Sequence, residues 1–213
     1  MTSKRLMEYA LFVRNTTEWR SPNIPVNEQH LSGSTVGIIG ASDVGQEVIR
    51  LLQPFHVRIM VYDPYLLPEK AQILGVEKVE LNHLMLSSDI VSIHAPNLPS
   101  TQNMIGAREL QMLRDGAVLI NTSRGTLIDP DALIGEASTG RIKIALDVTM
   151  PEPIPAENPL RKMSNVIIVP HLAGQGHYGH HRIGAATVQA LDDYFSGRPV
   201  VGSIDYKKWD TLA

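Results

Sequence analysis

Three polar residues of the sequence carry side chains that could together bind an acid and move a proton. Arg124, Glu152 and His171 each come shortly after a run of apolar residues. An arginine guanidinium binds a carboxylate through two parallel hydrogen bonds and polarises a neighbouring carbonyl group. A histidine can donate a proton to that carbonyl, and a glutamate bonded to the imidazole would fix its tautomer and favour its protonated form.

The segments that would have to position these residues alternate between strand and helix. Helices are predicted over 44–52 and 177–196, with helical or turn-rich stretches between the remaining elements. The pattern predicts an α/β fold, a doubly wound parallel sheet of the Rossmann type with flanking N- and C-terminal helices. The predicted strands cover residues 35–39, 57–62, 89–94, 117–121, 142–148 and 166–169.

The three polar residues fall on one rim of such a sheet, because each follows the carboxyl end of a strand, where open α/β sheets bind ligands. A guanidinium, a carboxylate and an imidazole on one rim suit the reduction of a 2-keto acid by hydride from a nicotinamide. Each residue also has a plainer interpretation. Arg124 could be a surface cation, Glu152 a solvated loop acid and His171 a strand-end histidine.

The turn between the first strand and the first helix partly matches the dinucleotide-binding fingerprint G-x-G-x-x-G. Gly40 and Gly45 fit, but Ser42 replaces the middle glycine, which normally lets the backbone approach the pyrophosphate. The Ser42 hydroxyl could donate a hydrogen bond there, whereas Asp43 would repel a pyrophosphate at the helix N-terminus. A strand–turn–helix without a ligand therefore remains an alternative.

Asp63 ends the second predicted strand, 23 positions after Gly40, close to the spacing of about 20 expected of a ribose-binding acid. Its carboxylate could accept hydrogen bonds from the ribose hydroxyls and would repel a 2′-phosphate, which favours NAD over NADP. Pro64 and Tyr65 follow, so no adjacent arginine could hold such a phosphate. The alternative is a plain Asp-Pro turn.

The chain divides into four predicted parts. These are an N-terminal helix within 1–20, a linker over 21–34, an NAD-binding domain over 35–176, and a C-terminal helix and tail over 177–213. The first helix is predicted over 4–19 from an apolar stripe of Leu6, Ala10, Leu11 and Val13.

Composition excludes several classes of protein. The net charge of −3 gives no sign of a broad basic face for nucleic acid, and no apolar run approaches the length of a membrane span. The chain has no cysteine, which rules out disulfides and thiolate chemistry and is compatible with a cytoplasmic location.

Four segments resemble the D-isomer-specific 2-hydroxyacid dehydrogenase family, and the resemblance runs from about residue 4 to residue 200. The most specific is VLINTSRGTLID at 118–129, which resembles the family's arginine signature. ALDV at 145–148 with PEP at 151–153 resembles its glutamate segment, and PHLAG at 170–174 its histidine segment. VSIHAP at 91–96 also fits.

The resemblance implies catalytic roles for Arg124, Glu152 and His171, a small 2-hydroxy or 2-keto acid as substrate, and NAD as cofactor. It also implies a homodimer that involves the N-terminal helix. Asp147 is expected to meet the nicotinamide amide. With the phosphate loop included, the expected cofactor contacts are Gly40, Ser42, Asp43, Val44, Gly45, Asp63, Ala95, Pro96, Thr122, Ser123, Arg124, Asp147, His171 and Gly174.

Two departures from the family pattern lead to further expectations. Ser42, together with Asp43 where the family often has arginine, predicts weaker NAD binding than in a typical relative. The family also builds its substrate domain mainly from sequence that precedes the helix at which this chain opens. Most of that domain is therefore expected to be missing, and this chain alone is expected to turn over little substrate.

Other functions stay open. The chain could be a non-catalytic NAD(H)-binding regulatory module or a truncated remnant. Another α/β nucleotide binder, such as a methyltransferase, would account for Gly40 and Asp63 but not for the three rim residues. His177 and His181 are spaced to share a metal ion, but no carboxylate is close in sequence, and no metal site is expected.

Overall fold

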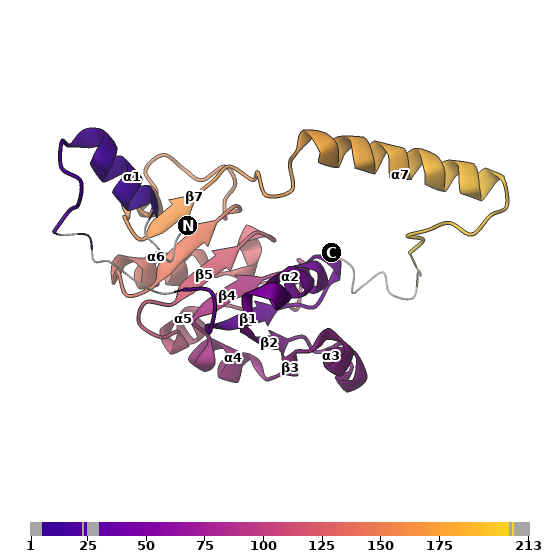
Figure 1. Cartoon of the computed structure of the whole chain (residues 1–213), viewed down its shortest axis with the longest axis horizontal. Coiled ribbons are helices and arrows are strands. Elements are labelled where there is room, and N and C mark those ends of the chain that lie inside the picture. Colours follow the sequence, from indigo (N-terminus) through magenta and orange to yellow (C-terminus); the bar gives the residue numbers. More distant parts are fainter. Residues whose placement is uncertain (1–5, 23, 25–29, 205, 207–213) are drawn as a thin grey trace.

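The structure is a computed structural model that describes residues 6–22, 24, 30–204 and 206, and its centre is a seven-stranded parallel sheet (Figure 1). The strand order is β3-β2-β1-β4-β5-β6-β7, so the direction of winding reverses between β1 and β4. This confirms the doubly wound parallel fold. The strands are β1 (Thr35–Ile39), β2 (Arg58–Tyr62), β3 (Glu77–Lys78), β4 (Ile90–Ile93), β5 (Val118–Asn121), β6 (Lys143–Leu146) and β7 (Val166–Ile168).

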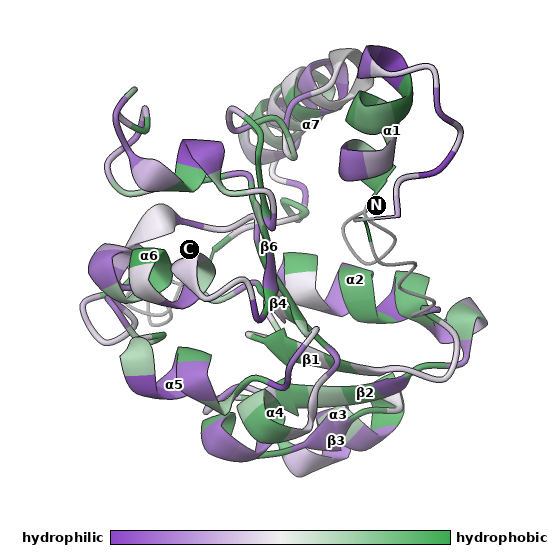
Figure 2. Ribbon diagram, turned by 90° about the vertical axis from the view of Figure 1, so that its left-hand side faces the viewer, coloured by the Kyte–Doolittle hydropathy of each residue, from purple (hydrophilic) through white to green (hydrophobic). Residues whose placement is uncertain are grey.

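Helices cover both faces of the sheet. The α-helices are α1 (Leu6–Asn15), α2 (Asp43–Leu52), α3 (Pro68–Leu74), α4 (Leu81–Ser87), α5 (Ala107–Met112), α6 (Pro130–Ser138) and α7 (His177–Phe195). Short 3-10 helices are η2 (Gln53–Phe55), η3 (Gly125–Leu127) and η4 (Pro159–Lys162). The helix α2 lies on one side of the sheet and α5 and α6 lie on the other (Figure 2).

Two apolar clusters hold these layers together. Ile38 of β1 packs with Ile49 of α2 on one face, whereas Ile39 packs with Leu84 of α4 on the other. Neighbouring residues of one strand point to opposite faces, so a strand covered on both sides must be apolar at nearly every position. This is why the central strands are continuous apolar runs in the sequence.

An ion pair between a buried acid and a partly exposed arginine joins elements at the end of the sheet opposite the carboxyl-end rim. The Arg141 side chain, just before β6, lies 2.6 Å from the Glu136 carboxylate of α6, which is 7% exposed. Its guanidinium also donates to the main-chain carbonyls of Leu110 and Leu113 at the end of α5. These contacts join α5, α6 and the segment before β6 through carbonyls at the C-terminal end of α5.

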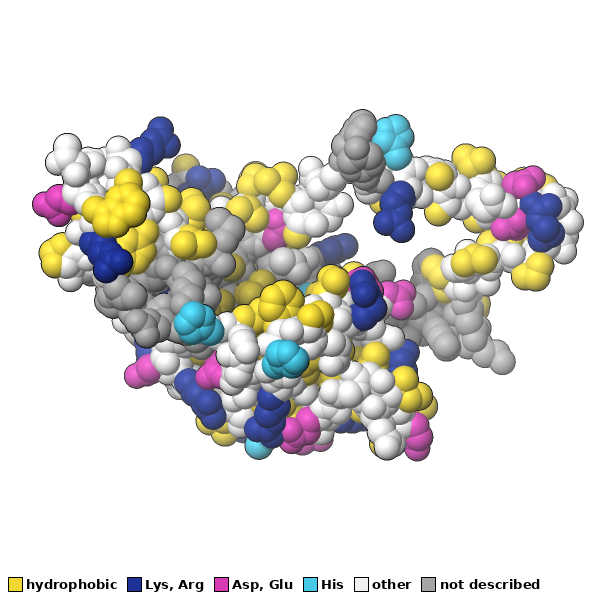
Figure 3. Space-filling view, in the orientation of Figure 1, with side chains coloured by type: hydrophobic (Ala, Val, Ile, Leu, Met, Phe, Trp, Pro, Cys, Tyr) yellow, Lys and Arg dark blue, Asp and Glu magenta, His cyan; other side chains and the backbone are white. Residues whose placement is uncertain are grey.

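The first and last helices carry apolar side chains that little else covers. None of the residues of α1 is buried, and α7 extends away from the sheet (Figure 1). Ile183 and Phe195 of α7 are 63% and 81% exposed, and apolar side chains are visible on both helices in Figure 3. Within the described chain, no helix has both the length and the apolar character needed to cross a membrane.

The predicted elements differ from the observed ones mainly at their ends. The first helix ends at Asn15, not at residue 19, because the Thr16 hydroxyl donates to the Phe12 carbonyl and accepts from the Glu18 amide, which ends the helix. Lys4 and Arg5 lie outside the described residues. The short edge strand β3 was not predicted, because its residues Glu77 and Lys78 are charged and exposed and give no apolar signal.

Candidate active site

His171 and Glu152 are in direct contact at the carboxyl-end rim of the sheet. His171 follows β7 and adopts a left-handed backbone conformation with φ of 51°, which is uncommon for a residue other than glycine. Its Nδ1 lies 2.7 Å from Glu152 Oε1, and the two side chains are 44% and 43% exposed. With Nδ1 protonated and bonded to the carboxylate, Nε2 remains available to exchange a proton with a bound molecule.

Asp147, directly after β6, holds the loop that carries His171. Its carboxylate accepts hydrogen bonds from the amides of Leu172 and Ala173, at 2.6 and 3.0 Å, and the residue is 4% exposed. Its carbonyl accepts the His171 amide at 2.9 Å. The backbone conformation of His171 is therefore fixed by a buried acid on the neighbouring strand.

Arg124 belongs to the Arg124 loop (residues 122–124), which follows β5. Its side chain is exposed, and its Nη1 donates to the Ser123 carbonyl at 2.7 Å. Within the described residues, no hydrogen bond or ion pair joins Arg124 to Glu152 or His171. A substrate carboxylate could therefore bind the guanidinium without breaking an ion pair.

Glu152 and His171 are among the residues that line a groove of about 910 Å³. Met7 and Leu11 of α1 form part of its wall, and the edge strand β7 forms another part. A groove of this size is large enough for a small organic acid together with part of a cofactor.

The turn between β1 and α2 has the backbone shape that a dinucleotide needs. Gly40 has φ of 94°, and a Cβ atom built on Gly45 would lie 2.1 Å from the Gly40 carbonyl oxygen. These glycines allow α2 to start close against β1, so that its N-terminus points to the rim. The main-chain amides of that first turn have no partner within the helix and can bind a pyrophosphate.

Ser42 and Asp43 modify this turn in different ways. The Ser42 hydroxyl donates to the His94 carbonyl at 2.9 Å, so it is bound to β4 and not directed to a ligand. Ser42 makes no side-chain cap to α2, which leaves the first amides of the helix uncapped. Asp43 is exposed in the first turn of α2, where it would repel a phosphate, and Val44 beside it is 62% exposed.

Asp63 lies at the end of β2 with both carboxylate oxygens bonded to main chain. Oδ2 accepts from the Ala41 amide at 2.7 Å, and Oδ1 accepts from the Tyr65 amide at 2.8 Å. The acid is therefore held against the phosphate loop, and each oxygen has a further lone pair for a ribose hydroxyl. This arrangement, together with the uncapped amides of α2, fits an NAD adenosine and pyrophosphate.

His94 lies buried beneath the phosphate loop, at the end of β4. Its Nε2 is 2.9 Å from the Ser92 hydroxyl, and its Nδ1 has no hydrogen-bond partner in the described part of the chain. Burial lowers the pKa of the imidazole to about 4, so His94 is neutral at pH 7. Its role is to support the loop by packing and through its carbonyl.

The remaining expected cofactor residues lie along the same rim. Ala95 is buried and Pro96 half-buried after β4, and Thr122 is exposed after β5. The Ser123 hydroxyl donates to the Ile93 carbonyl at 2.9 Å, which links the Arg124 loop to β4. Gly174 is exposed beyond the His171 loop.

The side chain of His177 lies outside the described residues, so the expectation of no metal site at His177 and His181 stays a prediction. Elsewhere in the described chain, no group of three or more acidic or histidine side chains is arranged to hold a metal ion.

The chain matches a family model over residues 1–173, described as the D-isomer specific 2-hydroxyacid dehydrogenase, NAD binding domain. The chain belongs to this family. The seven-stranded parallel sheet is therefore the NAD-binding domain of a 2-hydroxyacid dehydrogenase. The cofactor of this domain is NAD, as the sequence predicted.

Relatives of this 2-hydroxyacid dehydrogenase domain include two archaeal proteins named glyoxylate reductase. That of Korarchaeum cryptofilum is 39% identical over 75% of this chain, and that of Thermococcus litoralis is 35% identical over 92%. A D-isomer specific 2-hydroxyacid dehydrogenase of Lactobacillus delbrueckii, solved in an NAD-complexed form, superposes with a TM-score of 0.83 at 25% identity, over 96% of this chain and 66% of its own. The chain spans 48% and 60% of the two archaeal relatives.

Sequence reasoning missed two features of the site. Asn121, the last residue of β5, was not among the expected site residues, although it is buried and contacts the Arg124 loop. The hydrogen bonds from the amides of Leu172 and Ala173 to the Asp147 carboxylate were also not predicted. The available signal was a polar residue at the end of an apolar strand, but sequence alone does not show where such a side chain turns.

Proposed function

We propose that this chain is the cofactor-binding part of an NAD-dependent oxidoreductase that interconverts a small 2-keto acid and a 2-hydroxy acid. The observation that carries the proposal is the 2.7 Å contact between His171 Nδ1 and Glu152 Oε1, on the rim that also holds the Arg124 loop. An imidazole oriented by a carboxylate is a competent proton donor and acceptor.

Each of the three residues has a distinct part in the proposed reaction. The Arg124 guanidinium binds the substrate carboxylate and draws electron density from the adjacent carbonyl. Bound NADH supplies the hydride. His171 donates its Nε2 proton to the carbonyl oxygen as the hydroxyl group forms, and Glu152 stabilises the imidazolium before that transfer. In the oxidative direction, His171 accepts the hydroxyl proton.

The proposed cofactor site runs from Asp63 over the N-terminus of α2 to the rim. Asp63 is placed for the adenosine ribose, and its negative charge disfavours a 2′-phosphate. Thr122, Ser123, Asp147 and Gly174 are proposed to lie near the nicotinamide end. Since the Asp147 carboxylate already accepts two main-chain amides, a nicotinamide amide would have to share it.

Turnover by this chain alone is expected to be slow, because His171 and Glu152 are almost half exposed and water is not excluded from them. The test is NADH oxidation with glyoxylate, pyruvate or hydroxypyruvate, by the wild-type chain and by His171→Gln and Arg124→Gln. Slow oxidation that requires the keto acid and is lost in both variants supports the proposal. Equal rates in all three proteins would overturn it.

A non-catalytic NAD(H)-binding regulatory module is the second candidate function. The exposure of His171 and Glu152 favours it, because water is not excluded from the two side chains. Tight NADH binding without any keto-acid-dependent oxidation would support this alternative against the enzyme.

We also propose a homodimer and a cytoplasmic location. Apolar side chains on α1, including Leu6 at 49% and Leu11 at 50% exposure, support self-association. Light scattering of wild type and of Leu6→Ser/Leu11→Ser would test the dimer, since the variant is expected to be monomeric.

The lack of cysteine is compatible with the cytoplasm, and cell fractionation would test the location.

A further inference from the structure

Asn121 is the last residue of β5, is 1% exposed, and turns its side chain back against the Arg124 loop. Its Nδ2 donates to the Arg124 carbonyl at 2.8 Å, and its Oδ1 accepts the Ser123 amide at 3.0 Å. We propose that Asn121 is a positioning residue that holds Arg124 where it can bind the substrate carboxylate. The inference rests on the proposed function, in which Arg124 is the carboxylate-binding residue.

The Arg124 side chain depends on this support. It is exposed, and its hydrogen bond to the Ser123 carbonyl lies within the same loop. The direction of the guanidinium is therefore set by the main chain of the loop. An asparagine amide offers a donor and an acceptor in one plane, and in a buried position water does not compete for either.

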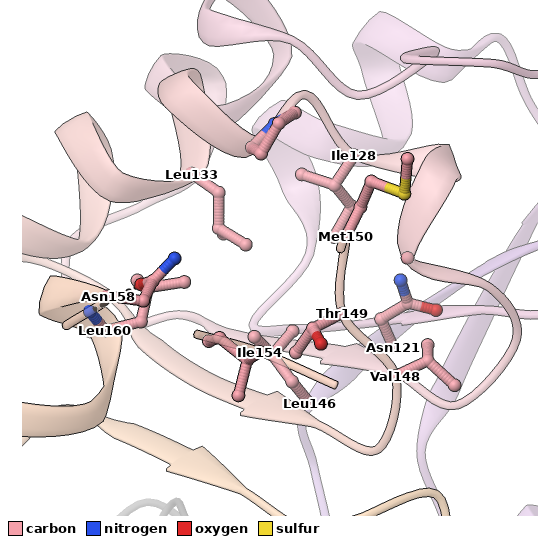
Figure 4. Close-up of a pocket in the computed structure, with 12 residues that line it drawn as sticks. Asn121, Ile128, Leu133, Leu146, Val148, Thr149, Met150, Ile154, Asn158 and Leu160 are labelled. Carbon is pink, nitrogen blue, oxygen red and sulfur yellow. Dashed lines mark hydrogen bonds between the residues drawn. The ribbon is translucent and has the colours of Figure 1, made fainter. Parts of the chain in front are cut away.

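Two further contacts fix the loop from other sides. Ser123 donates to the Ile93 carbonyl of β4, and at Gly125, the residue directly after the loop, an added Cβ atom would lie 2.1 Å from the Thr149 carbonyl oxygen. The C-terminal end of the loop is thus held by a close contact between Gly125 and the segment that leads to Glu152. Figure 4 shows Asn121 next to Val148 and Thr149, at the edge of a hollow of about 20 Å³. A hollow of this size holds no more than about one water molecule and leaves the amide little room to move.

The main chain of Asn121 also connects the Arg124 loop to His171. The Asn121 carbonyl accepts the Asp147 amide at 2.9 Å, and the Asp147 carbonyl accepts the His171 amide at 2.9 Å. Asn121 therefore fixes the Arg124 loop relative to the ends of β5 and β6, and the end of β6 also positions His171. A purely structural role would lower stability without a selective effect on the keto acid.

The matched control is Asn165, before β7 at the opposite end of the sheet. Its Nδ2 donates to the carbonyls of Ala137 and Ile142, both at 2.9 Å, far along the strands from the rim. The variants Asn121→Asp and Asn165→Asp each remove the amide donor and keep the shape of the side chain. Asn121→Ala and Asn165→Ala remove the whole amide group.

Steady-state kinetics with NADH and glyoxylate provide the first measurement. We expect Asn121→Asp to raise the KM for glyoxylate about tenfold, with smaller changes in kcat and in the Kd for NADH, because Arg124 loses its position whereas Asp63 and the N-terminus of α2, which hold most of the proposed cofactor site, keep theirs. Asn165→Asp should leave all three values as in the wild type. A KM change no larger than in Asn165→Asp overturns the inference.

Amide hydrogen exchange provides a second measurement that needs no turnover. Asn121→Ala removes the acceptor of the Ser123 amide, so its exchange should accelerate at least about tenfold, whereas Asn165→Ala should leave it unchanged. Unchanged exchange at Ser123 overturns the inference. If the wild-type chain oxidises no NADH, the proposed function fails, and the exchange result alone decides whether Asn121 holds the loop.

Discussion

Glu152 and His171 come from separate loops, yet the carboxylate and the imidazole Nδ1 are 2.7 Å apart. Replacing Glu152 by Gln keeps a possible acceptor but removes the charge that stabilises the imidazolium. We expect keto-acid-dependent NADH oxidation to fall about 10- to 100-fold in Glu152→Gln. Because both side chains are almost half exposed, the free energy of unfolding should hardly change. Glu157→Gln, a nearby exposed acid, is the control and should retain wild-type activity.

Asp43 is expected to weaken NADH binding by its charge at the start of α2. Asp43→Arg should lower the Kd for NADH about fivefold at low salt, and less at high salt, as charge–dipole and charge–charge effects of about 1 kcal/mol predict. The control is Glu69→Arg, which makes the same change in the first turn of α3. Both variants should lose about 0.5–1 kcal/mol of stability through the helix dipole. An affinity equal to that of the wild type would show that Asp43 does not face the cofactor.

His94 makes stability depend on pH. Its folded-state pKa of about 4 is below the usual histidine pKa of 6.5, so the unfolded chain binds a proton first as the pH falls. The contribution of neutral His94 is present above pH 6.5 and is lost between about 6.5 and 4, a change of about 3 kcal/mol. Denaturant unfolding should show that the free energies of unfolding of the wild type and of His94→Gln approach each other as the pH falls from 6.5 to 4. The exposed His83→Gln variant should follow the wild type, and parallel curves for His94→Gln would contradict the assignment.

Gly45 is required by the fold whether or not NAD is bound. A methyl group there would lie 2.1 Å from the Gly40 carbonyl oxygen, so α2 or the turn must shift. We expect Gly45→Ala to lower the free energy of unfolding by about 2–3 kcal/mol in the absence of cofactor. Gly135 of α6 has open space around its Cβ position, and Gly135→Ala should raise stability by about 0.5–1 kcal/mol. Equal effects at both positions in chemical denaturation would refute this steric account.

The sequence was sufficient for every strand except β3 and for placing the polar residues after the strands on one rim, because both depend on local pattern. Apolar runs identify buried parallel strands, and the residues after Ile93, Asn121 and Ile168 must then share one edge. The direction of side chains at that edge was not predictable. The Ser42 hydroxyl turns to the His94 carbonyl, and Asp147 turns to the His171 loop, because nearby unpaired main-chain groups attract them. Such groups are known only once the loops are placed.

Arg141 has a consequence for engineering this protein. Its bonds to Glu136 and to the carbonyls at the end of α5 lie one strand length from the rim, about 13 Å at the rise of a parallel strand. Substitutions that far apart usually act additively. Variants selected for heat tolerance at the Arg141 end could therefore be combined with variants selected for new substrates at the rim, with little need to re-optimise either set.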